Sequence, residues 1–194
     1  VGQMLGLKVA LAEDVTEQLA EAEELEWTDA AAADATFFQV LSSNDLPNDA
    51  RVKALAGRVR CALRQRSEPQ AAQARQNLSE LQTAGQGSQP EVKQASAMLW
   101  IDEKQREVGD ADLQSLKEKA EASPRDLATV QAYAVTVFWS KGGEVAAFDA
   151  ALALLRRDRS DEAKKLVLSL VEALGPRHPK SASARRSFSN ALFV

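Results

Sequence analysis

The chain has 194 residues and a formal net charge of −4 at pH 7, and 45% of its residues are hydrophobic although only 5% are aromatic. This length suits one domain or one repeat array with a sizeable core, and the acidic balance excludes a general nucleic-acid-binding protein. The single cysteine, Cys61, excludes an intramolecular disulfide framework and a CxxC redox motif, and no apolar run approaches the roughly 20 residues that a bilayer-spanning helix needs.

The composition predicts an all-α fold. Alanine favours helices and is abundant, whereas the β-branched and aromatic residues that favour strands are sparse and do not alternate. A first helix is expected from about Ala12 to Leu25, and Thr28 or Asp29 can cap a second helix that ends near Leu41. Apolar spacing and turn residues predict the next helices at about 52–66, 69–81, 90–108 and 110–122.

The last third of the chain has the clearest helical pattern. Ser123-Pro124-x-Asp126 is a start signal for one helix, and Gly142-Gly143 precedes another. The strongest amphipathic stripe lies at 160–174 and ends at Gly175-Pro176, before a short terminal helix. The helices are short and paired, about eight in number, and recur at roughly 35–45 residues, which predicts a helix-turn-helix solenoid.

These signals divide the chain into five expected parts. Residues 1–11 form an N-terminal extension, and 12–82 form the first helix pairs of the repeat array. The stretch TAGQGSQ at 83–89 is the expected flexible linker, since it is rich in glycine and polar residues. Residues 90–176 form the later helix pairs, and 177–194 form a C-terminal helix that either caps the array or docks on a partner.

Several segments resemble tetratricopeptide domains. Trp27-Thr28-Asp29-Ala30 resembles the aromatic-turn-alanine step of a tetratricopeptide unit, and Gly143-Glu144-Val145-Ala146 occupies the equivalent place later. The C-terminal order of ALALLRRD (151–158), Leu174-Gly175 and ARRSF (184–188) with Leu192-Phe193 resembles the C-terminal helical domain of the chaperedoxins. These are bacterial thioredoxin-fold holdases that associate with chaperonin. The chain departs from that family because it contains no thioredoxin domain, and because Ala184 stands where the family tends to have an aromatic residue.

The resemblance implies a tetratricopeptide-like solenoid that serves as a non-catalytic protein–protein interaction scaffold. The partner is expected to be a chaperonin or the subunits of a larger assembly, with no nucleic acid, cofactor, metal, small-molecule substrate or direct membrane span. Apolar spacing in the terminal helix and its paired arginines mark the candidate contact residues. These are Arg185, Arg186, Phe188, Leu192 and Phe193.

A second function remains open, that of an accessory or linker subunit of a large chloroplast or mitochondrial membrane complex. The sequence begins at Val1 instead of methionine, so we expect a fragment or a processed chain. A thioredoxin domain before Val1 would favour the chaperone function, and a transit peptide would favour the subunit. The single cysteine suits a reducing compartment, either the cytoplasm or an organelle interior (stroma or matrix) after removal of a targeting peptide.

Other candidate residues each have a functional and a structural interpretation. Cys61 is a regulatory thiol or, as we favour, a small buried residue that shares a helix face with Gly57. His178 is a catalytic base or, as we favour, a loop histidine between two prolines. The acidic run from Glu13 to Asp29 is a patch for a basic partner or a solvated helix face, and the second is more common. Trp100 and Trp139 line a pocket or, as we favour, fill the core. No nucleotide-binding, zinc-protease or serine-nucleophile motif is present, so no enzyme activity is expected.

Overall fold

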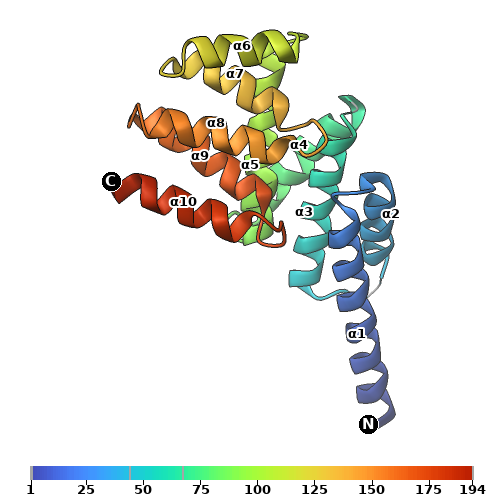
Figure 1. Ribbon diagram of the computed structural model, residues 1–194. Helices are drawn as coiled ribbons and strands as arrows, with labels where there is room; N and C mark the ends of the chain where they lie inside the picture. The colour runs from blue at the N-terminus through green and yellow to red at the C-terminus, as the bar shows by residue number, and fades with distance from the viewer. Residues whose placement is uncertain (1, 44, 67, 194) are drawn as a thin grey trace. The chain divides into compact units, whose positions relative to one another are not determined.

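A computed structural model of the protein describes residues 2–43, 45–66 and 68–193, with side chains from Asp14 onwards except that of Glu68. Within this part of the chain all regular structure is helical, with ten helices and no strand (Figure 1). The predicted all-α fold is therefore confirmed, but the predicted count of about eight is too low. The helices on either side of Ser123–Asp126 and the terminal helix are separate elements, as their individual turn and start signals predict.

The helices group into two compact units, Val1–Ala95 and Ser96–Val194. The first unit holds α1 (Gly2–Leu25), α2 (Ala30–Leu41), α3 (Asn48–Gln65) and α4 (Glu68–Thr83). The helix α5 (Pro90–Val108) contributes its first turns to this unit and the remainder to the second unit. The second unit continues with α6 (Leu113–Ala122), α7 (Leu127–Val137), α8 (Gly143–Leu155), α9 (Asp161–Leu174) and α10 (Ser181–Phe193).

Most helix ends lie where the turn residues predict them. The Asp29 carboxylate accepts a hydrogen bond of 3.0 Å from the Ala32 N–H at the start of α2, and Ser160 Oγ accepts one of 3.2 Å from the Ala163 N–H in α9. Gly175 ends α9 with a φ of 70°, which favours glycine because it has no Cβ. The expected linker 83–89 corresponds to the turn between α4 and α5. Gly85 in this turn has a φ of 77°.

The first helix begins earlier than its pattern indicates. It was expected from about Ala12 but starts at Gly2, so the expected N-terminal extension is helical in its described residues. Leucine, methionine, lysine and alanine in this stretch have high helix propensity, and no proline interrupts the run. The amphipathic criterion missed the segment because its apolar residues do not fall on one face.

In the first unit α1, α2 and α3 pack against one another, and α4 packs on α3. Phe37 of α2 is fully buried, and its ring lies directly over Gly57 of α3, where any Cβ would overlap the ring. The sequence pattern of α3 predicts one buried stripe, yet Ala54, Gly57, Arg60 and Cys61 outside that stripe are also buried. The reason is that α3 contacts three helices, α1, α2 and α4, and so is covered on more than one side. The predicted stripe consists of Val52, Leu55, Ala56, Val59 and Leu63, and of these Leu55 is only half-buried.

In the second unit α6, α7, α8 and α9 each pack on the helix that follows them in the chain. In addition, α7 contacts α9, and α8 contacts α10. Contacts between every second helix are typical of stacked helix pairs. The predicted stripe of α9 is confirmed because all its members are buried. They are Ala163, Leu166, Val167, Leu170, Val171 and Leu174.

Candidate protein-binding surface

The terminal helix α10 is held in place by small residues. Its buried side chains are those of Ser181, Ala184 and Ala191, which recur at helical spacing and lie against α8 and α9. Small side chains allow helix axes to approach closely, so α10 is anchored without placing its large residues in the core. Ala184 takes part in this anchoring, since it is buried.

The outward face of α10 carries four of the five candidate contact residues. Leu192 and Phe193 are 40% and 89% exposed, and both arginines are exposed. Residues seven apart in a helix lie on the same face about 10 Å from each other. Leu192 therefore shares a line with Arg185, and Phe193 shares one with Arg186. The fifth residue, Phe188, is half-buried at the edge of this face. That these residues contact a partner stays a prediction.

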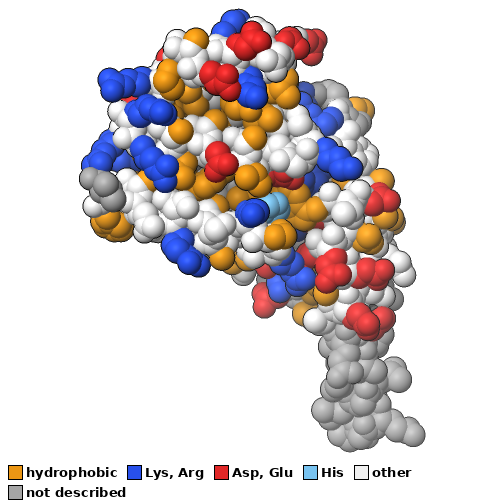
Figure 2. Space-filling view, viewed as in Figure 1, with side chains coloured by type: hydrophobic (Ala, Val, Ile, Leu, Met, Phe, Trp, Pro, Cys, Tyr) orange, Lys and Arg blue, Asp and Glu red, His pale blue; other side chains and the backbone are white. Residues whose placement is uncertain are grey.

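The charged side chains of α10 and of the loop before it all have one sign. Residues 173–194 include Arg177, Lys180, Arg185 and Arg186 and no aspartate or glutamate. In Figure 2 basic side chains lie on the side of α10 that is turned to the viewer. Arg185 Nε donates a hydrogen bond of 3.4 Å to Ser181 Oγ. An exposed apolar end on a helix with exposed cations suits an apolar site with carboxylates nearby on another protein.

The loop before α10 contains His178, which is half-buried. Its Nδ1 accepts a hydrogen bond of 3.2 Å from the Lys180 backbone N–H, and its carbonyl accepts one of 2.9 Å from the Ser181 N–H. Both bonds fix the chain just before α10. The histidine therefore has a structural task in the loop, in agreement with the interpretation that the sequence favours.

Burial of Glu26 is a feature that the sequence analysis missed. Glu26 belongs to the acidic run, yet it is only 3% exposed, whereas Asp14, Glu17, Glu21 and Glu24 are exposed. The expected solvated helix face is therefore correct for these four residues and wrong for Glu26. Nothing local distinguishes Glu26 from its neighbours, because its partners are more than 30 residues away in the sequence.

The partners of Glu26 are two arginines of α3. Arg60 Nε lies 3.0 and 2.9 Å from the two carboxylate oxygens, and Arg60 Nη2 lies 2.8 Å from Oε2. Arg64 Nε lies 3.5 Å from Oε1, and its guanidinium stacks on the Trp27 ring at 3.5 Å from the centroid. Burial by itself lowers the pKa of Arg60, but the charge and hydrogen bonds of Glu26 outweigh it and raise the pKa. This buried cluster ties the α1–α2 turn to α3.

Cys61 is fully buried beside this cluster, as the structural interpretation expects. Burial raises the pKa of its thiol, and the negative charge of Glu26 raises the pKa further. A raised pKa and a closed environment make the thiol unreactive in the folded protein. A regulatory thiol would need the opposite properties.

The buried thiol makes stability pH-dependent in one direction. An unfolded cysteine ionises at about pH 8.5. The folded thiol stays protonated there, so its stabilisation is complete below that pH and is lost as the pH rises above it. We expect the free energy of unfolding in urea to fall by about 1 kcal/mol more between pH 8.5 and 9.5 in the natural chain than in Cys61→Ala. Equal falls in the two proteins would contradict a protonated buried thiol.

The two tryptophans that were expected in the core, Trp100 and Trp139, are less buried than a core position requires. Met98, Ile101 and Phe138 are buried, but Trp100 and Trp139 are half-buried. The Lys165 ammonium lies 5.7 Å from the Trp100 ring centroid, and Trp139 packs edge-on to Phe138 at 5.0 Å. Consecutive apolar residues point in different directions around a helix, so only some of them reach the core. The predicted core role is thus correct for Met98, Ile101 and Phe138, and only partly correct for the two tryptophans.

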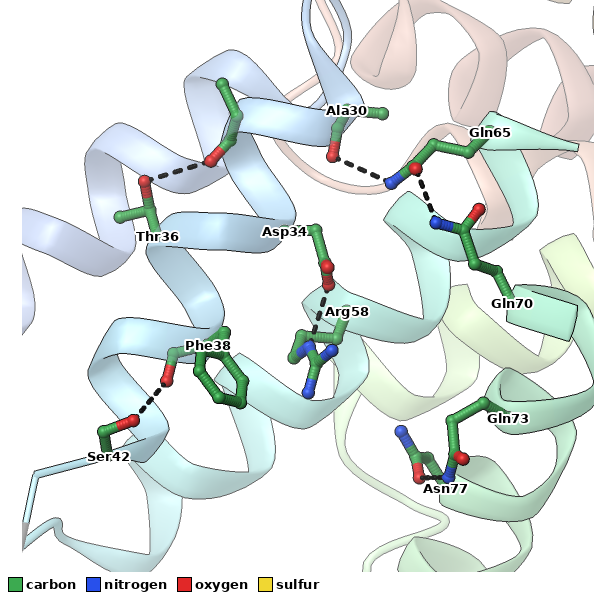
Figure 3. A network of polar contacts seen from close by, with 11 residues as sticks. Ala30, Asp34, Thr36, Phe38, Ser42, Arg58, Gln65, Gln70, Gln73 and Asn77 are labelled. Carbon is green, nitrogen blue, oxygen red and sulfur yellow. Dashed lines mark hydrogen bonds and ion pairs between the residues drawn. The ribbon is translucent and has the colours of Figure 1, made fainter. Parts of the chain in front are cut away.

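A second exposed aromatic residue, Phe38 of α2, has a different environment. It is 57% exposed, and the Arg58 guanidinium lies 5.1 Å from its ring centroid. The same arginine donates from Nε to Asp34 at 2.8 Å, as Figure 3 shows. Phe38 is therefore flanked by a neutral ion pair of its own chain, in contrast to Phe193, whose helix carries the exposed Arg185 and Arg186.

Two further observations concern other classes of site. Among the residues that the structure describes, no three histidine, cysteine, aspartate or glutamate side chains come together in a group able to hold a metal ion. None of the described helices is both long and apolar enough to cross a bilayer.

Comparison with known proteins shows that part of the second half of the chain is similar to a repeat family. Residues 106–193 match the family model described as tetratricopeptide repeat, a segment that includes α6 to α10 entirely. No curated protein and no solved structure matched the chain. The expected tetratricopeptide-like helical fold is confirmed, and tetratricopeptide repeats indicate a scaffold for protein–protein interaction.

Proposed function

We propose that the chain is a non-catalytic scaffold that binds a partner protein through the outward face of α10, and that this partner is a chaperonin. The observation that carries the proposal is the exposure of Phe193, which is 89% exposed at the end of a helix that small buried residues hold in place. A large apolar side chain exposed at a rigid position is a common anchor in protein interfaces.

Two features support the choice of partner. The segment that matches a tetratricopeptide repeat ends with this helix, and the order of parts from 151 to 193 resembles the domain that docks chaperedoxins on chaperonin. The basic character of residues 177–186 adds an electrostatic contribution, which steers association and weakens as salt rises.

The proposal predicts that removal of the apolar end of α10 weakens binding strongly. Purified chain and purified bacterial chaperonin oligomer are mixed, and the dissociation constant is measured by biolayer interferometry. We expect Leu192→Ala with Phe193→Ala to raise the dissociation constant by about tenfold or more, because both side chains lose contact area without leaving the core.

The matched control is Phe38→Ala, which removes an exposed aromatic residue from α2 and should leave the dissociation constant unchanged. Equal effects of the two variants would refute a role for α10. No binding of the natural chain to chaperonin would refute the choice of partner. In that case, comigration of the chain with a membrane assembly on a native gel would favour the accessory subunit of an organellar complex.

A further inference from the structure

The first and last helices of the chain carry opposite charges on their exposed faces. On α10 the side chains of Arg185 and Arg186 are exposed, and within the described part of the chain neither forms an ion pair. This face also holds exposed Leu192 and Phe193, so it joins a cationic half to an apolar half.

The complementary face lies on α1. Asp14, Glu17, Glu21 and Glu24 follow one another at spacings of three, four and three residues, which places all four carboxylates on one side of the helix. All four are exposed, and Figure 2 shows acidic side chains along the described part of α1. Within this face, Gln18 Nε2 donates a hydrogen bond of 3.3 Å to Asp14 Oδ1. Carboxylates at these spacings repel one another, and nearby cations would relieve the repulsion.

Both helices are the terminal helices of their units. The first, α1, packs on α2 and α3, and the last, α10, packs on α9 and α8. The exposed carboxylates make the outer face of α1 acidic, whereas the outer face of α10 is basic and partly apolar.

We propose that the outward face of α10 in one copy of the chain docks on the acidic face of α1 in a second copy. The contact is head-to-tail, because the two faces are different and each copy has one of each. Association of this kind leaves one unused face at each end of a pair, so further copies can add as the concentration rises until a ring closes or an open chain grows. It also covers Phe193, so self-association and partner binding through α10 exclude each other. This inference goes beyond the proposed function and does not depend on chaperonin.

Sedimentation velocity of the purified chain tests the inference. At about 20 mM NaCl we expect a weight-average mass that rises above 21.0 kDa with concentration, and at about 500 mM NaCl a return to the monomer, since salt screens exposed charges. Arg185→Glu with Arg186→Glu should weaken association by about tenfold or more, and so should Glu17→Arg with Glu21→Arg.

The decisive variant carries all four changes. It reverses both faces at once, so the charges are complementary again and association should return to within about threefold of the natural chain. Lys117→Glu with Lys119→Glu, on the exposed side of α6, is the control and should change nothing. A chain that stays monomeric at low salt overturns the proposal. So does a quadruple variant that does not associate while its circular dichroism shows a native helix content.

Discussion

Replacement of Glu26 by glutamine is expected to lower the free energy of unfolding by about 3–5 kcal/mol, although the change removes no more than one charge. The carboxylate accepts from Arg60 and lies near Arg64, and both guanidinium groups are mostly buried. Glutamine keeps the shape but leaves Arg60 with an uncompensated charge that is only 2% exposed. Equilibrium unfolding in urea, followed by circular dichroism at the helix band, measures the change.

The control for this prediction is Glu24→Gln, two residues earlier on the exposed face of α1, which should change the free energy by less than about 0.5 kcal/mol. A second test replaces both charges. Glu26→Leu with Arg60→Met should be more stable than either single variant, because a buried pair can be exchanged for apolar residues at little cost. If Glu24→Gln and Glu26→Gln had equal effects, the buried cluster would not stabilise the α1–α2 turn.

The second large effect is expected at the contact between Phe37 and Gly57. Phe37 is fully buried in the first unit, so Phe37→Ala should lower the free energy of unfolding by about 3–5 kcal/mol through the cavity that it leaves. Gly57→Ala adds a methyl group where the Phe37 ring already lies and should cost about 1–3 kcal/mol. The same urea titration measures both variants.

These two positions should also depend on each other. Alanine has a better helix propensity than glycine by about 1 kcal/mol, so once Phe37 is shortened to leucine the Gly57→Ala change should become neutral or stabilising. An equally large cost of Gly57→Ala in both backgrounds would show that the ring contact is not the reason for glycine at this position. Gly87→Ala is a control, since a Cβ there meets no close neighbour.

Local signals were sufficient for most of the fold. The apolar stripe of α9 and the caps at Asp29 and Ser160 could be predicted from the sequence, because apolar spacing and turn chemistry act within one or two turns of a helix. The start of α1 could not be predicted from apolar spacing, since a helix can form from helix propensity alone without an apolar face. The extra burial of α3 follows from its place between neighbours, which no single helix pattern contains.

The candidate surface was predictable in its residues but not in its geometry. The sequence pointed to Arg185, Arg186, Leu192 and Phe193, and left open whether the terminal helix caps the array or docks on a partner. The structure shows that small residues anchor α10, and that the candidate residues other than Phe188 are exposed. Glu26 was misassigned because its burial depends on Arg60, which is distant in the sequence.

The central claim is that the outward face of α10 contacts another protein. It is tested most directly by a photoreactive phenylalanine analogue placed at position 193 and, in a second sample, at position 38, both of which are exposed aromatic residues. After irradiation in extract of the source cells, denaturing electrophoresis should show one dominant adduct with a different protein from position 193 and none from position 38. No adduct from position 193, or the same adducts from both positions, would contradict the account.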